Sequence, residues 1–93
     1  MKIQLNGYIL VPDDRMDTVR AGLVDHIRLT HAEPGCISFD VTEDPEISGR
    51  FNVAEIFTDQ SSFDAHQTRT KASVWAEITA GIPREYSITE VPD

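Results

Sequence analysis

The sequence predicts an α+β protein with a ferredoxin-like βαββαβ fold, in which helices cover one face of a single antiparallel sheet. The first observation is a β-hairpin: residues 36–41 and 51–57 alternate apolar and polar side chains around a polar turn with proline and glycine. The second is a pair of helical patterns, over residues 15–30 and 61–80, one on each side of the hairpin. The third is an alternating segment at each end of the chain, which completes two βαβ-like halves.

The first predicted strand, residues 2–11, is apolar on both faces. One face carries Ile3, Leu5, Gly7, Ile9 and Val11. The other is only partly polar, since Tyr8 and Leu10 stand there beside Asn6. Such a strand is expected to be covered on both sides, by helices on one and by another element, such as a partner's sheet, on the other. The last strand, residues 85–91, alternates in the same way and closes the sheet.

The first helix is expected to begin after Pro12, which breaks the strand, with Asp13 or Asp14 as its cap. Early acidic residues also suit the positive end of the helix dipole. Helical periodicity gathers an inner set on roughly one third of the circumference. This set is Met16, Val19, Leu23, His26, Ile27 and Thr30. The set is expected to face the sheet, while the charged residues elsewhere on the helix are solvated.

The second helical region follows the hairpin directly. Asp59 or Ser61 can supply its N-cap. If the helix is continuous, one face carries Phe63, His66, Thr70 and Val74. The polar stretch 67–71 can instead divide it into two pieces, and Gly81 and Pro83 end it.

Composition indicates a globular protein and excludes several kinds of partner. The 93 residues allow one domain, 1–93, and a charged content of 26% beside 40% hydrophobic residues argues against disorder. The net charge of −8 repels phosphate backbones and anionic lipid, so nucleic acid and membranes are not expected partners. No apolar run approaches the ~20 residues that span a bilayer, and a single cysteine favours a reducing, cytoplasmic location. A domain this small gains from pairing, so we expect a homodimer.

The candidate catalytic residues are His66, His26 and Glu55. Both histidines fall on inward helix faces and can line one pocket, where a pKa near neutrality suits a general base. Each can equally be a structural histidine with one hydrogen bond. Glu55 shares an apolar strand face and needs a partner, which Arg69 or Arg84 could supply. A structural salt bridge and a role in orienting a histidine or a substrate proton both stay open for it.

The other reactive residue types point away from metal and thiol chemistry. His26 and His31 cannot share a ligand-bearing helix face, and the chain has no His-x-x-x-His pair, so we predict no metal site. His31 is expected to be solvated beyond the helix end, and Cys36 to be a small buried hydrophobe. The aromatic side chains either build the core or form a flat slot for an aromatic substrate. They are Trp75, Phe39, Phe57, Phe63 and Tyr86.

Three short motifs carry a resemblance to a known family. They are the turn Glu33-Pro34-Gly35-Cys36, the strand pattern Phe51-x-Val53-x-Glu55, and Ala65-His66 on the following helix. Over nearly its whole length the chain resembles the antibiotic biosynthesis monooxygenase (ABM) family, in particular its small quinol-monooxygenase-like members. The resemblance implies sheet-to-sheet pairing as a dimeric α+β barrel. It also implies oxidation of a quinol or a similar electron-rich aromatic compound by O2, without a cofactor.

The same resemblance implies roles for individual residues. His66 is the base, Glu55 or His26 its orienting group, and Arg69 a contact for the substrate anion. The expected substrate-binding residues are Arg69, Trp75, Phe63, Asn6 and Tyr86. With such a base, the deprotonated substrate itself would reduce oxygen.

Two alternatives stay open beside the monooxygenase. The segment 44–51, with Glu55 and His66, is also similar to the ABM-fold isomerase of phosphorylated autoinducer-2, although that protein's further histidine has no counterpart in residues 67–71. The other alternative is a dimer that binds a small molecule without catalysis. The haem-degrading branch of the superfamily uses a histidine further along the second helical region. This chain has none there, so haem is not expected.

Overall fold

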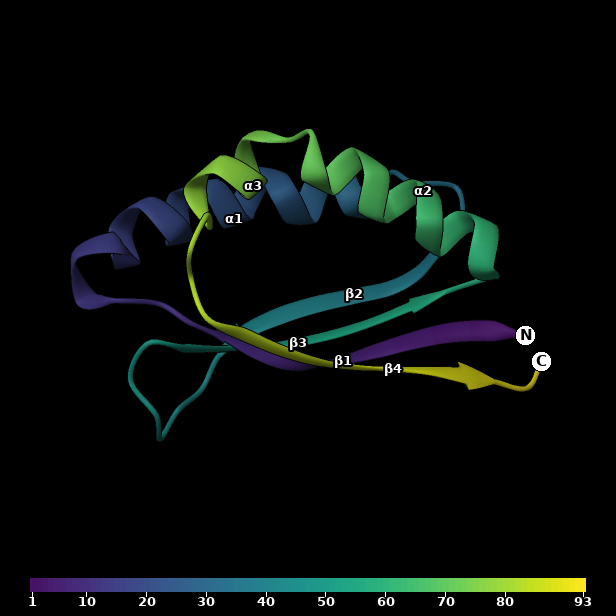
Figure 1. Ribbon diagram of the computed structural model, residues 1–93, viewed down its shortest axis with the longest axis horizontal. Helices are drawn as coiled ribbons and strands as arrows, with labels where there is room; N and C mark the ends of the chain where they lie inside the picture. Colours follow the sequence, from purple (N-terminus) through teal and green to yellow (C-terminus); the bar gives the residue numbers. More distant parts are fainter.

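The computed structural model describes residues 1–93, and its elements follow the predicted order (Figure 1). The strands are β1 (Lys2–Leu10), β2 (Cys36–Glu43), β3 (Arg50–Phe57) and β4 (Arg84–Val91). The helices are α1 (Met16–His31), α2 (Gln60–Lys71) and α3 (Val74–Ile78). The strands form one antiparallel sheet in the order β2-β3-β1-β4, and the helices lie over one face of it (Figure 1). The predicted α+β, ferredoxin-like fold is confirmed.

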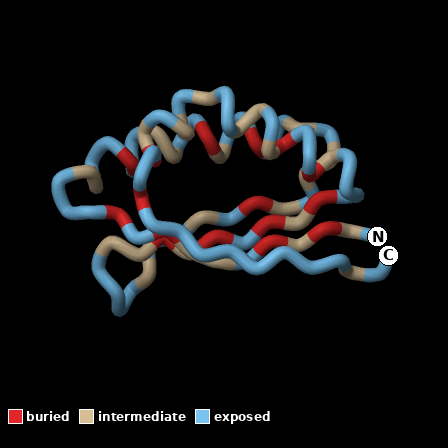
Figure 2. The backbone as a smooth tube through the Cα atoms, viewed as in Figure 1, coloured by how far each residue is buried: buried red, intermediate tan, exposed pale blue.

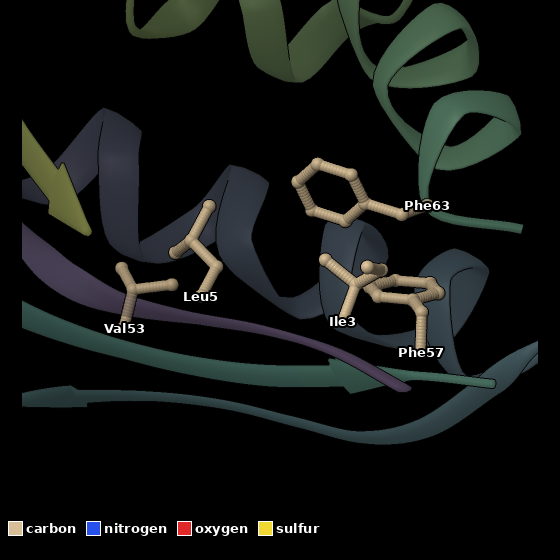
Figure 3. Close-up of a cluster of buried hydrophobic side chains, with 5 residues drawn as sticks. All are labelled: Ile3, Leu5, Val53, Phe57 and Phe63. Carbon is tan, nitrogen blue, oxygen red and sulfur yellow. The ribbon is translucent and has the colours of Figure 1, made fainter. Parts of the chain in front are cut away.

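Alternate residues of β1 and β3 build the core under the helices. Leu5 of β1 lies opposite Glu55 on one side and opposite Ile88 of β4 on the other. Buried positions on the sheet face buried positions on the helices (Figure 2). One apolar cluster consists of Ile3, Leu5, Val53, Phe57 and Phe63 (Figure 3). A second consists of Ile9, Val11, Val19, Phe51 and Ile82. Buried polar residues belong to neither cluster, and these are His26, Thr30, Glu55, His66 and Thr79.

The predicted inner face of α1 is confirmed, but the helix begins differently from the prediction. The predicted inner residues are all buried or partly buried: Met16, Val19, Leu23, His26, Ile27 and Thr30. The chain enters α1 through a short 3-10 turn, η1 (Asp13–Arg15), so no aspartate side chain caps the helix. Instead the Arg15 backbone N–H donates to the Pro12 carbonyl. Asp13 and Asp14 lie in that first turn, where their charge still suits the dipole.

The second helical region is divided, at a point just after the polar stretch. Asp59 caps α2, since its carboxylate accepts a backbone hydrogen bond at 2.8 Å. α2 ends at Lys71, and the side chain of Ser73 then caps α3. The break turns Val74 outward with 68% of its surface exposed, so the predicted extension of the buried face to Val74 is wrong.

Two surfaces of the sheet are left uncovered. No element packs on the face away from the helices (Figure 1). On the helix side, Tyr86 and Ile88 of the edge strand β4 are 41% and 54% exposed. The expected pairing of the open face with a second copy stays a prediction. None of the helices combines the length and the apolar character that crossing a membrane requires.

Candidate active site

His66 lies on the inner face of α2, one turn after Phe63. The Asp59 cap fixes the start of the helix, and burial of Phe63 in the first apolar cluster turns the same face toward the sheet. The His66 side chain is 3% exposed. Its Nδ1 lies 3.0 and 3.2 Å from the two carboxylate oxygens of Glu33, in the turn between α1 and β2. This turn supplies the partner that a buried imidazole needs.

Arg69 binds the same carboxylate. Its Nε donates to Glu33, and a terminal nitrogen donates to the Thr30 hydroxyl at 3.0 Å. Because an ion-paired Glu33 can only accept hydrogen bonds, neutral His66 donates to it from Nδ1–H. The lone pair of His66 is therefore on Nε2, the nitrogen nearer Glu55.

Glu55 stands on the inner face of β3 with its side chain 6% exposed. Its Oε1 is 3.7 Å from His66 Nε2, which is too long for a hydrogen bond. The predicted pairing with Arg69 or Arg84 is wrong: Arg69 is bound to Glu33, and Arg84 donates to a backbone carbonyl. Without a cation beside it, burial raises the pKa of Glu55 to about 7, and the charge of Glu33 adds to this.

His26 reaches the same space from α1. Its ring is stacked on Trp75 of α3, with 4.8 Å between centroids and 6° between planes. The His26 and His66 ring centroids are 6.2 Å apart. His26 Nδ1 is buried without a hydrogen-bond partner. Since a buried N–H without an acceptor is a rare and costly state, we place the proton of neutral His26 on Nε2.

Both imidazoles are neutral at pH 7. Burial, assisted by the charge of Arg69 and by His66, lowers the pKa of His26 to about 4. Burial also lowers the pKa of His66, although the hydrogen bond and charge of Glu33 act in the opposite direction. A neutral imidazole has one N–H donor and one bare nitrogen. His66 thus offers a hydrogen-bond acceptor and His26 a donor.

These side chains line one cavity of about 150 Å³ between the sheet and the helices α2 and α3. Leu5 and Ile9 contribute to it from the two apolar clusters. Its exposed lining residues are Lys71, Arg84 and Tyr86, which mark the opening beside the uncovered edge strand β4. A cavity of this volume can hold a benzene-sized ring.

The structure brings five predicted site residues together and leaves three outside. The five that line the cavity are His26, Glu55, His66, Trp75 and Tyr86. Phe63 lies in the first apolar cluster (Figure 3), and Arg69 forms an ion pair with Glu33. Asn6 is exposed on the open face of the sheet, beside a shallow groove. The cavity therefore gives no support to substrate contacts by Phe63, Arg69 or Asn6.

Sequence patterns do not assign a role to Glu33. Its turn is one of the motifs of the sequence, but the contact with His66 spans 33 positions and no periodicity predicts it. One signal is available: Glu33 lies two residues beyond α1, whose last two turns carry the inward residues His26 and Thr30. Three further lining residues come from the last turns of α2, and they are Gln67, Thr70 and Lys71.

The remaining reactive residues lie outside the cavity. His31 is exposed as predicted, but it is the last residue of α1 and does not lie beyond the helix; its Nε2 is 2.9 Å from the Phe39 carbonyl oxygen. Cys36 is half-buried against the first apolar cluster, and burial raises the pKa of its thiol. No three side chains among His, Cys, Asp and Glu are grouped to hold a metal ion.

Comparison with known proteins shows which family the chain matches. The model of the antibiotic biosynthesis monooxygenase family matches residues 3–77, a range that includes His26, Glu33, Glu55 and His66. No curated protein matches the chain in sequence.

Several solved structures share the fold. A protein of Deinococcus radiodurans, provisionally named an antibiotic biosynthesis monooxygenase, has a TM-score of 0.83 at 20% identity, over 100% of this chain and 94% of its own. One from Nitrosomonas europaea with the same provisional name has a TM-score of 0.79 at 20% identity, over 98% of each chain. The protein Rv0793 of Mycobacterium tuberculosis has a TM-score of 0.78 at 21% identity, over 100% and 97%. At such identities the likeness supports the fold alone.

Proposed function

Because the chain belongs to the antibiotic biosynthesis monooxygenase family, we propose that it is a cofactor-independent monooxygenase acting on a quinol or similar electron-rich phenol. One observation carries the proposal. Two neutral imidazoles line one cavity, and their hydrogen bonding differs: His66 presents a bare Nε2, while His26 presents an N–H. This pairing can remove a proton from a hydroxyl group and stabilise the oxyanion that remains.

His66 acts first, as the general base. Its Nε2 takes the hydroxyl proton of the substrate, and the phenolate oxygen accepts a hydrogen bond from His26. The ionised Glu33, held by Arg69, stabilises the imidazolium that forms. Glu55, 3.7 Å from the same nitrogen and with a pKa of about 7, can exchange that proton near neutral pH.

The substrate supplies all the electrons. The phenolate gives one electron to O2, and the two radicals join through a new C–O bond at a ring carbon as a peroxide anion. The peroxide takes the proton from the His66 imidazolium and becomes a hydroperoxide, which restores the neutral base. Loss of the proton on that carbon breaks the O–O bond, leaves a carbonyl group and releases the second oxygen as water. One hydroquinone and one O2 thus yield one hydroxyquinone and one water. The ring loses four electrons and O2 gains four, so no external reductant takes part.

The protein binds the ring, accepts the proton and excludes water from the reacting atoms. Leu5, Ile9 and Val53 close the cavity on the sheet side, and Trp75 and Phe39 flank His26. A low-dielectric wall strengthens both the hydrogen bond to the phenolate and the Glu33–imidazolium interaction.

We also propose that the active form is a homodimer in the cytoplasm. Proteins of this family commonly dimerise, the open sheet face carries no packed element, and a single cysteine suits a reducing compartment. The isomerase and binding alternatives have no observation of their own to favour them, because the same base would serve any of these roles.

Isotope labelling tests the activity. Purified protein is incubated with methylhydroquinone and other small hydroquinones under 18O2, and the products are analysed by mass spectrometry. We expect one labelled oxygen atom per hydroxyquinone and equal consumption of O2 and quinol. Hydrogen peroxide with unlabelled quinone as the only products, as in simple autoxidation, would contradict the proposal.

A further inference from the structure

We propose that the preferred ligand of the cavity is a single-ring phenol that carries an anionic group, and that Lys71 and Arg84 hold this group at the opening. The inference rests on the proposed function for the chemistry of the ring. It adds two claims, the size of the ligand and its charge, and both can be tested by measuring binding without turnover.

The size follows from the space between the two apolar clusters. The cavity of about 150 Å³ takes one benzene-sized ring, and Leu5 and Ile9 bound it on the sheet side. A second fused ring would have to displace packed core side chains or extend through the opening. Displacing close-packed side chains is costly, so one ring is the better fit.

The charge follows from the distribution of basic residues. The chain has 16 acidic and 8 basic side chains, so carboxylates outnumber cations two to one. Four of the eight cations pair with a carboxylate, and these are Arg20, Arg28, Arg50 and Arg69. Lys71 and Arg84 have no carboxylate partner, and both are exposed where the cavity opens. Two unneutralised cations at one opening of an acidic protein favour an anion that comes from outside.

The interior fixes the orientation of the ligand. The inner end of the cavity holds Glu55, with no cation beside it, so a second anion would be repelled there whenever Glu55 is ionised. Thr70 Oγ1 is a buried polar atom without a hydrogen-bond partner, and Thr70 lines the same cavity as the donor His26 and the acceptor His66. A neutral hydroxyl suits this part of the site. The phenol group therefore points inward to the histidines and the anionic group outward to Lys71 and Arg84.

Three phenols that O2 oxidises slowly test the inference by isothermal titration. They are 4-hydroxybenzoate, 4-methylphenol and 6-hydroxy-2-naphthoate: one ring with a carboxylate, one ring without it, and two rings with it. We expect 4-hydroxybenzoate to bind about tenfold or more tightly than either of the others, because charge-assisted hydrogen bonds are the strong ones. Added salt should weaken only the binding of the two carboxylates.

Variants locate the contact. The double variant Lys71→Gln/Arg84→Gln should lose the preference for 4-hydroxybenzoate while binding 4-methylphenol as before. Arg84→Lys, which keeps the charge, should retain most of the preference. Lys2→Gln is the matched control, since Lys2 also lacks a carboxylate partner but does not line the cavity. Melting temperatures show whether each variant is folded.

The inference fails if the unaltered protein binds 4-methylphenol as tightly as 4-hydroxybenzoate, binds neither, or prefers the two-ring ligand. It also fails if the folded double variant keeps its preference. The proposed function is judged separately, by oxygen uptake with neutral methylhydroquinone. Oxygen uptake without a preference for the carboxylate ligand would contradict this inference alone. A preference for the carboxylate ligand without oxygen uptake from any quinol would contradict the monooxygenase activity and support the anion-binding site.

Discussion

Nδ1 of His66 lies 3.0 Å from a carboxylate oxygen of Glu33, and this contact decides which nitrogen of the imidazole is free for chemistry. Glu33 is itself paired with Arg69 and is therefore an acceptor only. The proton of neutral His66 stays on Nδ1, and Nε2 remains bare over the cavity. A carboxylate that orients a histidine through the far nitrogen also stabilises the charged ring after proton transfer.

Replacing Glu33 by glutamine is expected to slow turnover and move its pH dependence. The charge and hydrogen bond of Glu33 raise the pKa of His66, so the substitution lowers it. A general base must be deprotonated to act, and the acidic limb of the kcat/KM profile should therefore move to lower pH. The weaker base should also reduce the plateau rate by about tenfold. The pKa of His66 itself can be followed by NMR titration of its ring protons.

Glu43→Gln is the matched control for this variant, because Glu43 pairs with Arg20 on the surface, away from the cavity. Its pH profile should match that of the unaltered protein. If Glu33→Gln leaves both the acidic limb and the NMR titration of His66 unmoved, Glu33 does not position the base.

Glu55 should make the folded protein less stable as the pH rises from about 4.5 to 7. Its pKa is about 7 in the fold against 4.5 for a free glutamate, so the folded state binds more protons across this window. The associated stability is fully present below pH 4.5 and is lost as the pH passes through 7. Glu55→Gln removes this dependence and should be the more stable protein at pH 8, by on the order of 3 kcal/mol at most.

Urea unfolding of both proteins at several pH values checks the Glu55 prediction. The difference between the two is the informative quantity, since His26, with a pKa of about 4, contributes an opposite slope to both. A difference that does not change between pH 5 and 8 would mean that Glu55 is ionised throughout.

His26→Phe should separate packing from hydrogen bonding. Phenylalanine can keep the stack on Trp75, and it removes a buried nitrogen that has no partner. We therefore expect stability in chemical denaturation to be equal or higher. Loss of the N–H that faces the phenolate should lower kcat by roughly 10². A variant that is stable and fully active would show that His26 only packs.

The open face of the sheet should mediate self-association. Sedimentation equilibrium at micromolar concentration is expected to give about twice the chain mass of 10.4 kDa. Ala54, exposed in the middle of β3, is the position to perturb, and Ala54→Glu should shift the protein toward the monomer. Asp64→Lys, on the exposed side of α2, should leave the mass unchanged. A monomer for the unaltered chain would contradict the dimer.

Most of the fold could be predicted from local patterns. The alternation in β1 and β3, the breakers around the hairpin and the periodicity of α1 each act within a few residues, and the structure follows them. The predictions are wrong where a local hydrogen bond at a helix start competes with the helical periodicity of the sequence. Ser73 caps a new helix and turns Val74 outward, and a 3-10 turn replaces the expected aspartate cap at the start of α1.

The site was predictable only in part, for a physical reason. Inward faces of helices and strands follow from periodicity, which is how His26, Glu55 and His66 could be placed in one pocket. Their partners depend on contacts between distant segments. Glu33 lies in a turn, where no periodicity predicts which way its side chain points. It pairs with Arg69, which the sequence had suggested as a partner for Glu55. The absence of a cation beside Glu55, and with it the raised pKa of about 7, follows from that competition.

The central claim is that Nε2 of His66 removes the proton that starts the reaction. Oxygen uptake by His66→Ala, measured with small hydroquinones beside the unaltered protein and His31→Ala, tests it most directly. We predict that His66→Ala, compared as folded protein, loses activity by roughly 10² or more, that added imidazole restores part of it, and that His31→Ala is nearly silent. Equal oxygen uptake by folded His66→Ala and the unaltered protein would contradict the claim.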